Sequence, residues 1–184
     1  MAEFRRRTGF TLVELLIAAA LGVLLSGVAM RVLLGEARRG GALAKRLLLK
    51  GLQRRTLDLV KADLDVAASW QVAPAPDQTT VLSCPLAGRQ PLLAITPRHG
   101  TGPVLYSVGP APSTIWRGRV LMRCGPAFDL EGRMRPGSNY QNRVLLDAVE
   151  AFHITQPDGL PVLKLELEQR LSGDGPVVSS SAFG

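Results

Sequence analysis

The most distinctive feature of the hydrophobic pattern is one long apolar run near the N-terminus. From Phe10 to Met30 the sequence reads FTLVELLIAAALGVLLSGVAM, 21 residues in which Glu14 is the only charged side chain. As a helix this run rises about 31 Å, close to the thickness of the hydrocarbon core of a bilayer. The pattern therefore predicts a transmembrane helix over residues 10–30, preceded by a short polar stretch over residues 1–9.

The helical pattern continues beyond the apolar run. Apolar residues recur on one stripe, while basic and acidic residues fill the other faces, and the first proline is Pro74. The stripe consists of Leu49, Leu52, Val60, Leu64 and Ala67. We expect an amphipathic helix over 31–69 that ends before Trp70 and Pro74. A removable secretory signal would instead need a cleavage site after the apolar run, and no good AxA-like site follows it.

The pattern changes from about Val81 to short apolar runs that proline and glycine interrupt. We expect strands at Val81–Cys84, Leu92–Ile95, Val104–Val108, Ile115–Cys124, Val144–Ile154 and Val162–Gln169. Residues 125–143 have the composition of a loop, Pro157-Asp158-Gly159 is a turn signal, and 172–184 could form an edge strand or a tail.

The strand patterns predict a sheet with one buried face. Leu163, Leu165 and Leu167 alternate with charged residues, and in Ile115–Cys124 the apolar residues alternate with Arg117, Arg119 and Arg123. Such an antiparallel sheet needs a cover, which the amphipathic helix supplies. We therefore expect an α+β fold, with the long helix packed on an antiparallel sheet in a globular domain over 70–184.

Charge is distributed unevenly along the chain. Residues 1–55 hold eleven Lys and Arg against three Glu, a net charge of +8, so the other residues carry −1 of the total of +7. Such a basic segment suits a membrane surface, a nucleic acid or an acidic partner. Cys84 and Cys124 are the only cysteines, and composition leaves open whether they form one disulfide or remain two buried thiols.

Glu14 is the unusual residue of the apolar run. An acidic side chain in a membrane helix is costly, by about 2.5–3.5 kcal/mol on insertion scales, so such a residue usually has a function. Alternatively, Glu14 is a carboxyl tolerated one turn inside the membrane edge. Spacing alone does not decide between these interpretations.

The residues around Glu14 nevertheless resemble a known family. The stretch Gly9-Phe10-Thr11-Leu12-Val13-Glu14-Leu15-Leu16-Ile17-Ala18, with Arg5, Arg6 and Arg7 before it, is similar to the processing site of type IV prepilins and type II secretion pseudopilins. The resemblance implies that a prepilin peptidase cuts between Gly9 and Phe10 and methylates the new amine of Phe10. It also implies that Glu14 pairs with the terminal amine of a neighbouring pilin subunit during assembly.

The resemblance implies a pilin-like organisation and an orientation. Residues 1–9 form the removed leader, 10–30 the transmembrane helix, 31–69 its amphipathic continuation and 70–184 the sheet domain. Counting basic residues alone would place the far side of the membrane in the cytoplasm, because it carries more Lys and Arg than the leader. The family instead places the leader in the cytoplasm of a bacterial inner-membrane protein, with the sheet domain outside. Outside the cytoplasm, a disulfide between Cys84 and Cys124 is expected.

The resemblance favours a structural role in a filament, with an inner-membrane assembly platform, other subunits and membrane lipid as partners. Weaker similarity to larger minor pilins and J-type minor pseudopilins lies in the Trp-Arg-Gly, Arg-Cys-Gly and Val-Leu-Leu-Asp-Ala-Val stretches. A minor pilin is the first hypothesis, a minor pseudopilin of a type II secretion system the second, and a DNA-contacting competence pilin the third. The position of Cys84 and Cys124 differs from the C-terminal disulfide loop usual in major pilins.

The sequence offers no signature of an enzyme. It contains no phosphate loop, no HExxH, no nucleophile elbow and no paired-cysteine metal motif, so we expect no catalytic residue, cofactor or metal. His99 and His153 fall in different expected elements and are interpreted as ordinary histidines. DNA contact would rest on the basic residues alone, which give salt-sensitive, non-specific affinity.

Overall fold

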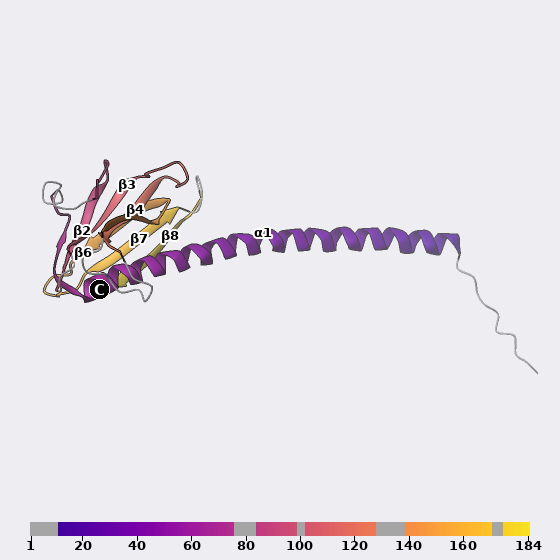
Figure 1. Ribbon diagram of the computed structural model, residues 1–184. Coiled ribbons are helices and arrows are strands. Elements are labelled where there is room, and N and C mark those ends of the chain that lie inside the picture. Colours follow the sequence, from indigo (N-terminus) through magenta and orange to yellow (C-terminus); the bar gives the residue numbers. More distant parts are fainter. Residues whose placement is uncertain (1–10, 76–83, 99–101, 128–138, 171–174) are drawn as a thin grey trace, which may run out of the picture. The chain divides into compact units, whose positions relative to one another are not determined.

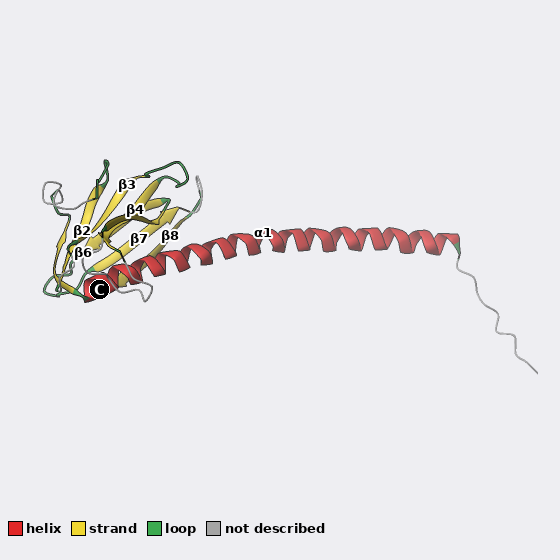
Figure 2. Ribbon diagram, in the orientation of Figure 1, coloured by secondary structure: helices red, strands yellow, loops and turns green. Residues whose placement is uncertain are grey.

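In the part of the chain that the structure describes, one long helix is followed by eight strands (Figures 1 and 2). The computed structural model describes residues 11–75, 84–98, 102–127, 139–170 and 175–184. The elements are α1 (Leu12–Asp65), β1 (Ala67–Val72), β2 (Gln90–Pro97), β3 (Val104–Pro110), β4 (Arg119–Pro126), β5 (Tyr140–Leu146), β6 (Val149–Thr155), β7 (Lys164–Arg170) and β8 (Val177–Phe183). They form two compact units, Met1–Ala44 and Lys45–Gly184, and α1 runs through both.

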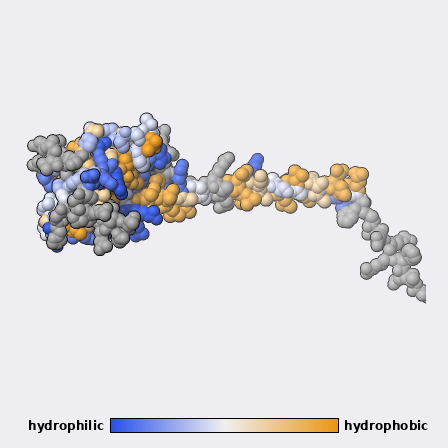
Figure 3. All heavy atoms as spheres, viewed as in Figure 1, coloured by the Kyte–Doolittle hydropathy of each residue, from blue (hydrophilic) through white to orange (hydrophobic). Residues whose placement is uncertain are grey.

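The first unit contains the apolar part of α1. Leu12–Gly35 has a mean hydropathy of 2.3 and none of it is buried within the protein, so by length and composition this segment can cross a membrane. Figure 3 shows apolar residues gathered along it. The predicted span at 10–30 falls largely within this segment, and its first residue, Phe10, lies outside the described residues.

The second unit begins with the amphipathic part of α1. Leu49, Val60 and Leu64 of the predicted stripe are buried, whereas Leu52 is 39% exposed. Leu57, which the predicted stripe did not include, is buried as well. Full burial of a side chain of this kind contributes about 1.5–3 kcal/mol. These side chains therefore hold the helix on the sheet.

The predicted helix end at Ser69 is wrong. The helix stops at Asp65, and Ala67 begins β1, which pairs antiparallel with β2. The N–H of Arg98 donates to the carbonyl of Val66 over 2.9 Å, and its side-chain Nε donates to the carbonyl of Ala67 over 2.8 Å. These bonds come from a residue distant in sequence, so a helical stripe that includes Ala67 could not reveal them.

The strands form two antiparallel sheets, one ordered β1-β2-β3-β4-β5 and the other β6-β7-β8. The α+β class with a helix on antiparallel sheets is confirmed. The prediction of one strand over Val144–Ile154 is wrong, because the chain leaves β5 at Leu146 and enters β6 of the other sheet at Val149. Ala148 has a positive φ of 52°, and its N–H donates to the carbonyl of Arg117 over 2.7 Å, which fixes the turn.

The remaining strand predictions differ mainly in their bounds. Leu92–Ile95, Val104–Val108 and Val162–Gln169 correspond to β2, β3 and β7, and the C-terminal residues form the edge strand β8. Ile115 and the next residues precede β4 rather than belong to it, and Cys84 lies outside any strand. The predicted loop at 125–143 is shorter at both ends, because β4 continues to Pro126 and β5 begins at Tyr140. Residues 81–83 and 128–138 lie outside the described part.

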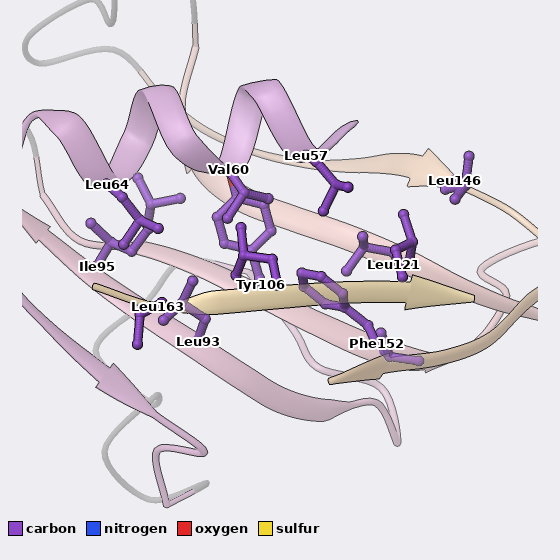
Figure 4. Close-up of a cluster of buried hydrophobic side chains, with 14 of the residues drawn as sticks. Leu57, Val60, Leu64, Leu93, Ile95, Tyr106, Leu121, Leu146, Phe152 and Leu163 are labelled. Atoms are coloured by element: carbon purple, nitrogen blue, oxygen red, sulfur yellow. The ribbon is translucent and has the colours of Figure 1, made fainter. Parts of the chain in front are cut away.

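One hydrophobic core joins the helix to both sheets. Figure 4 shows Leu57, Val60 and Leu64 of α1 directed toward side chains of the strands. Their buried neighbours include Leu93, Ile95, Tyr106, Leu121, Phe152, Leu163, Leu165 and Leu167. The helix is therefore the cover that the one-sided leucine pattern of β7 required.

Candidate functional site

The N-terminal end of α1 carries the residues that the sequence singled out for processing and assembly. Gly9 and Phe10 lie outside the described residues. Glu14 lies in the first turn of α1, and it is exposed among exposed apolar neighbours such as Val13 and Leu15. The structure thus places one carboxyl group on an apolar helix surface that can enter a membrane.

Thr11 caps this helix, a role that the sequence analysis did not assign. The backbone N–H of Glu14 donates to Thr11 Oγ1 over 3.3 Å. A Thr followed three residues later by Glu is the signature of a capping box, in which a side chain satisfies an N–H that the first helical turn leaves without a partner. The signal was present as Thr11-Leu12-Val13-Glu14. Glu14 therefore lies in the first turn of the helix and is also a charged residue within a segment that can cross a membrane.

Cys84 and Cys124 are brought together by the sheet domain. The structure joins them by a disulfide with an S–S distance of 2.06 Å and a Cα–Cα distance of 6.0 Å. Both are buried beside Leu105, which lies opposite Cys124 in the pairing of β3 with β4. The link ties the segment before β2 to β4, an inner strand of the five-stranded sheet.

A buried ion pair connects α1 to this sheet. Arg123 of β4 donates to both carboxylate oxygens of Asp63, with Nε–Oδ2 at 2.7 Å and Nη2–Oδ1 at 3.1 Å. Tyr106 Oη donates to Asp63 Oδ2 over 2.5 Å, and Arg123 Nη1 donates to the carbonyl of Pro126 over 3.2 Å. The Arg123 and Asp63 side chains are 4% and 1% exposed. The prediction that Arg123 faces solvent is therefore wrong.

The buried surroundings shift the pKa values of Tyr106 and Arg123. Burial raises the pKa of Tyr106 well above its usual value, and the neighbouring Asp63 carboxylate raises it further. For Arg123, burial lowers the pKa, but the hydrogen bonds and charge of Asp63 outweigh it and the net pKa is raised. Both effects favour a neutral phenol and a charged guanidinium. The cluster is thus built to remain one ion pair with a hydrogen-bonded tyrosine.

Nothing in the described part of the chain forms a metal centre. No group of three or more His, Cys, Asp or Glu side chains there could hold an ion. His153 is exposed on β6, and His99 lies outside the described residues. The described residues instead include an apolar helix with one carboxyl, which can anchor the chain, and a disulfide and a buried ion pair, which stabilise the sheet domain.

Comparison with known families identifies the N-terminal segment. Residues 4–30 match the family described as prokaryotic N-terminal methylation motif. This match supports the resemblance to type IV pilins and pseudopilins, whose members are structural proteins rather than enzymes. No curated protein and no solved structure matches the chain. The segment, with its apolar helix, is consistent with membrane anchoring and prepilin-type processing.

Proposed function

We propose that this protein is a structural subunit, a minor pilin, of a type IV pilus or a related filament. The observation that carries the proposal is the methylation motif at residues 4–30, which includes most of an unburied apolar helix, Leu12–Gly35, with a single carboxyl in its first turn. A chain with these features can be held in a membrane and then withdrawn to pack against other apolar helices. The folded second unit then remains as the part that the filament displays.

In this proposal, processing creates the partner that Glu14 needs. Cleavage between Gly9 and Phe10 frees an amine at Phe10, and methylation leaves that amine basic. A carboxylate in hydrocarbon is unfavourable by a few kcal/mol, whereas an opposite charge beside it offsets much of that cost. Glu14 is therefore most stable where the amine of a neighbouring subunit reaches it, and this requirement fixes the axial position at which each subunit docks.

A minor role is supported by the disulfide. Cys84 and Cys124 link the start of the sheet domain to β4, in the middle of the domain rather than near its C-terminus. Major pilins usually carry a C-terminal disulfide loop, so this arrangement suits a subunit that primes or decorates the filament. The proposed location before assembly is the bacterial inner membrane, with a prepilin peptidase and an assembly platform as partners.

The assembly role of Glu14 can be separated from insertion and cleavage. We expect Glu14→Leu to be inserted and cut normally but to be depleted from sheared filaments, because it cannot pair with the terminal amine. Glu14→Gln should be intermediate, since an amide can form a hydrogen bond but cannot neutralise a charge. Val13→Leu is the matched control, because it changes a neighbouring exposed apolar side chain and leaves the carboxyl in place.

The measurement is quantitative immunoblotting of cleaved protein in membranes and of subunit in sheared filaments from the producing bacterium. Depletion of Glu14→Leu alone supports the proposal. Equal incorporation of Glu14→Leu and Val13→Leu would show that Glu14 acts only as a tolerated residue in the first helical turn.

A further inference from the structure

Strand β8 forms the outer edge of its three-stranded sheet. It pairs with β7 on one side, and no other described strand pairs with it. Leu163 and Gly184, at the end of this pairing, exchange both backbone hydrogen bonds. Because such bonded positions alternate along an antiparallel pair, the N–H and C=O groups of Ser179 and Ser181 point away from β7.

This edge lacks charges, prolines and bulges, three features that usually prevent further strand pairing. Its sequence, VVSSSAF, contains no charged residue and no proline, and its register with β7 runs without a shift. Native proteins usually protect long, regular edges with charges, prolines, bulges or a covering element. Strand β8 is therefore competent to accept another strand.

An open groove of about 980 Å³ lies beside this edge. On one side it is lined by β8, and on the other by α1, whose charged side chains there are Lys50, Arg54, Asp58 and Lys61. All of these residues belong to the second unit. The groove thus offers backbone groups that no described strand pairs with on one wall, and three cations with one carboxylate on the other, a net positive charge.

Gln53 fixes the spacing between the two walls. It is fully buried, its Nε2 donates to the carbonyl of Val178 over 2.9 Å, and its Oε1 accepts a hydrogen bond from Ser180 Oγ over 2.7 Å. These bonds hold the helix beside β8 and leave Ser179 and Ser181 on the exposed side of the strand. The groove is consequently a preformed feature of the second unit.

We infer that this groove binds an extended, acidic segment of a neighbouring protein chain, which continues the sheet beyond β8. Alternate residues of a strand are about 6.8 Å apart, and Lys50 and Arg54 are separated by about 6 Å of helix rise. Carboxylates at every second position can therefore face these cations while the backbone pairs with Ser179 and Ser181. Glu166 and Glu168 line the outer part of the groove, so acidic side chains directed there would be repelled.

The inference goes beyond the filament role and rests on the second unit alone. It is tested with the full chain in zwitterionic lipid nanodiscs, by fluorescence anisotropy of labelled peptides. The probe is a peptide of alternating Glu and Thr of about eight residues, long enough to pair with the seven residues of β8. The same peptide with Lys in place of Glu tests the charge requirement.

Backbone methylation distinguishes strand pairing from simple charge attraction. Two further acidic peptides carry N-methyl groups on one or the other alternate set of amides. Methylation of the set that faces β8 should abolish binding, while methylation of the other set should preserve it. Equal binding of both methylated peptides, or no binding of the unmodified acidic peptide, would overturn the inference.

Two adjacent arginines provide the matched protein variants. Arg54 lines the groove, whereas Arg55 is exposed but does not line it. Arg54→Glu should weaken binding of the acidic peptide about tenfold, and Arg55→Glu should change it about twofold or less. Unchanged near-UV circular dichroism would show that both variants are folded. Equal losses in the two variants would indicate non-specific attraction to the basic helix and would contradict the proposed site.

Discussion

Removal of the Asp63 carboxylate should destabilise the sheet domain more than any change to an exposed ion pair. Asp63→Ala leaves the Arg123 guanidinium, only 4% exposed, without the carboxylate to which it donates, and the hydroxyl of Tyr106 without the acceptor that Asp63 provides. Loss of one partner from a buried pair costs about 3–5 kcal/mol. Domains are stable by about 5–15 kcal/mol, so the change should remove about a fifth of the stability or more.

The assay is urea unfolding of the full chain in nanodiscs, followed by the fluorescence of Trp70 and Trp116 in the second unit. Lys164→Met is the control, because Lys164 and Glu166 form an ion pair in which both side chains are about two-fifths exposed. That change should lower the free energy of unfolding by less than about 1 kcal/mol. Equal effects of Asp63→Ala and Lys164→Met would refute the reasoning.

A triple variant separates the cost of breaking the pair from the value of having it. Asp63→Leu, Arg123→Met and Tyr106→Phe together replace the polar cluster by apolar side chains. Such replacements are often neutral or stabilising, so the triple variant should be at least about 2 kcal/mol more stable than Asp63→Ala. A triple variant as unstable as the single one would show that the cluster itself supplies the stability.

Three further predictions concern the sheet domain. Thiol labelling of denatured, unreduced protein should find neither Cys84 nor Cys124 free, and the bridge should contribute about 4 kcal/mol to unfolding measured with and without reductant. The pKa of Tyr106 is raised in the folded state, so the neutral phenol should contribute its full stabilisation below about pH 10 and lose it as the pH rises further. In urea titrations at alkaline pH, the free energy of unfolding of a Tyr106→Phe variant should therefore fall less steeply than that of the unmodified protein. Gly109→Ala should lower the melting temperature, because its Cβ would lie 2.7 Å from Arg89 Cα.

The sequence was most informative where one residue pattern has one physical meaning. A long apolar run must be a helix that can enter a membrane, and the alternating leucines of β7 require a cover on one face. The order of glycine, phenylalanine and glutamate at residues 9, 10 and 14 pointed to the motif that the family comparison then matched. Each of these signals is local and does not depend on distant partners.

The errors arose where a distant partner decides the outcome. Alternation with arginine indicated a solvent-facing side of β4, but Arg123 is buried and pairs with Asp63 of α1, a partner that lies 60 residues away. The helix end depends on Arg98, and the break between β5 and β6 depends on a bond from Ala148 to Arg117. Periodicity cannot report such contacts. The C-terminal residues were expected to form an edge strand or a tail, and only the order of the sheet decides for the edge strand β8.

The most direct test of the account is the mass of the mature N-terminus. Peptide analysis of filament-associated protein should find a chain that begins with N-methylated Phe10, and Gly9→Leu should trap the full-length precursor in the membrane. Gly22→Leu is the control, because Gly22 has open space around it in the apolar helix, and this variant should be cut normally. Filament-associated protein that retains Met1 would contradict the proposed processing and, with it, the filament role.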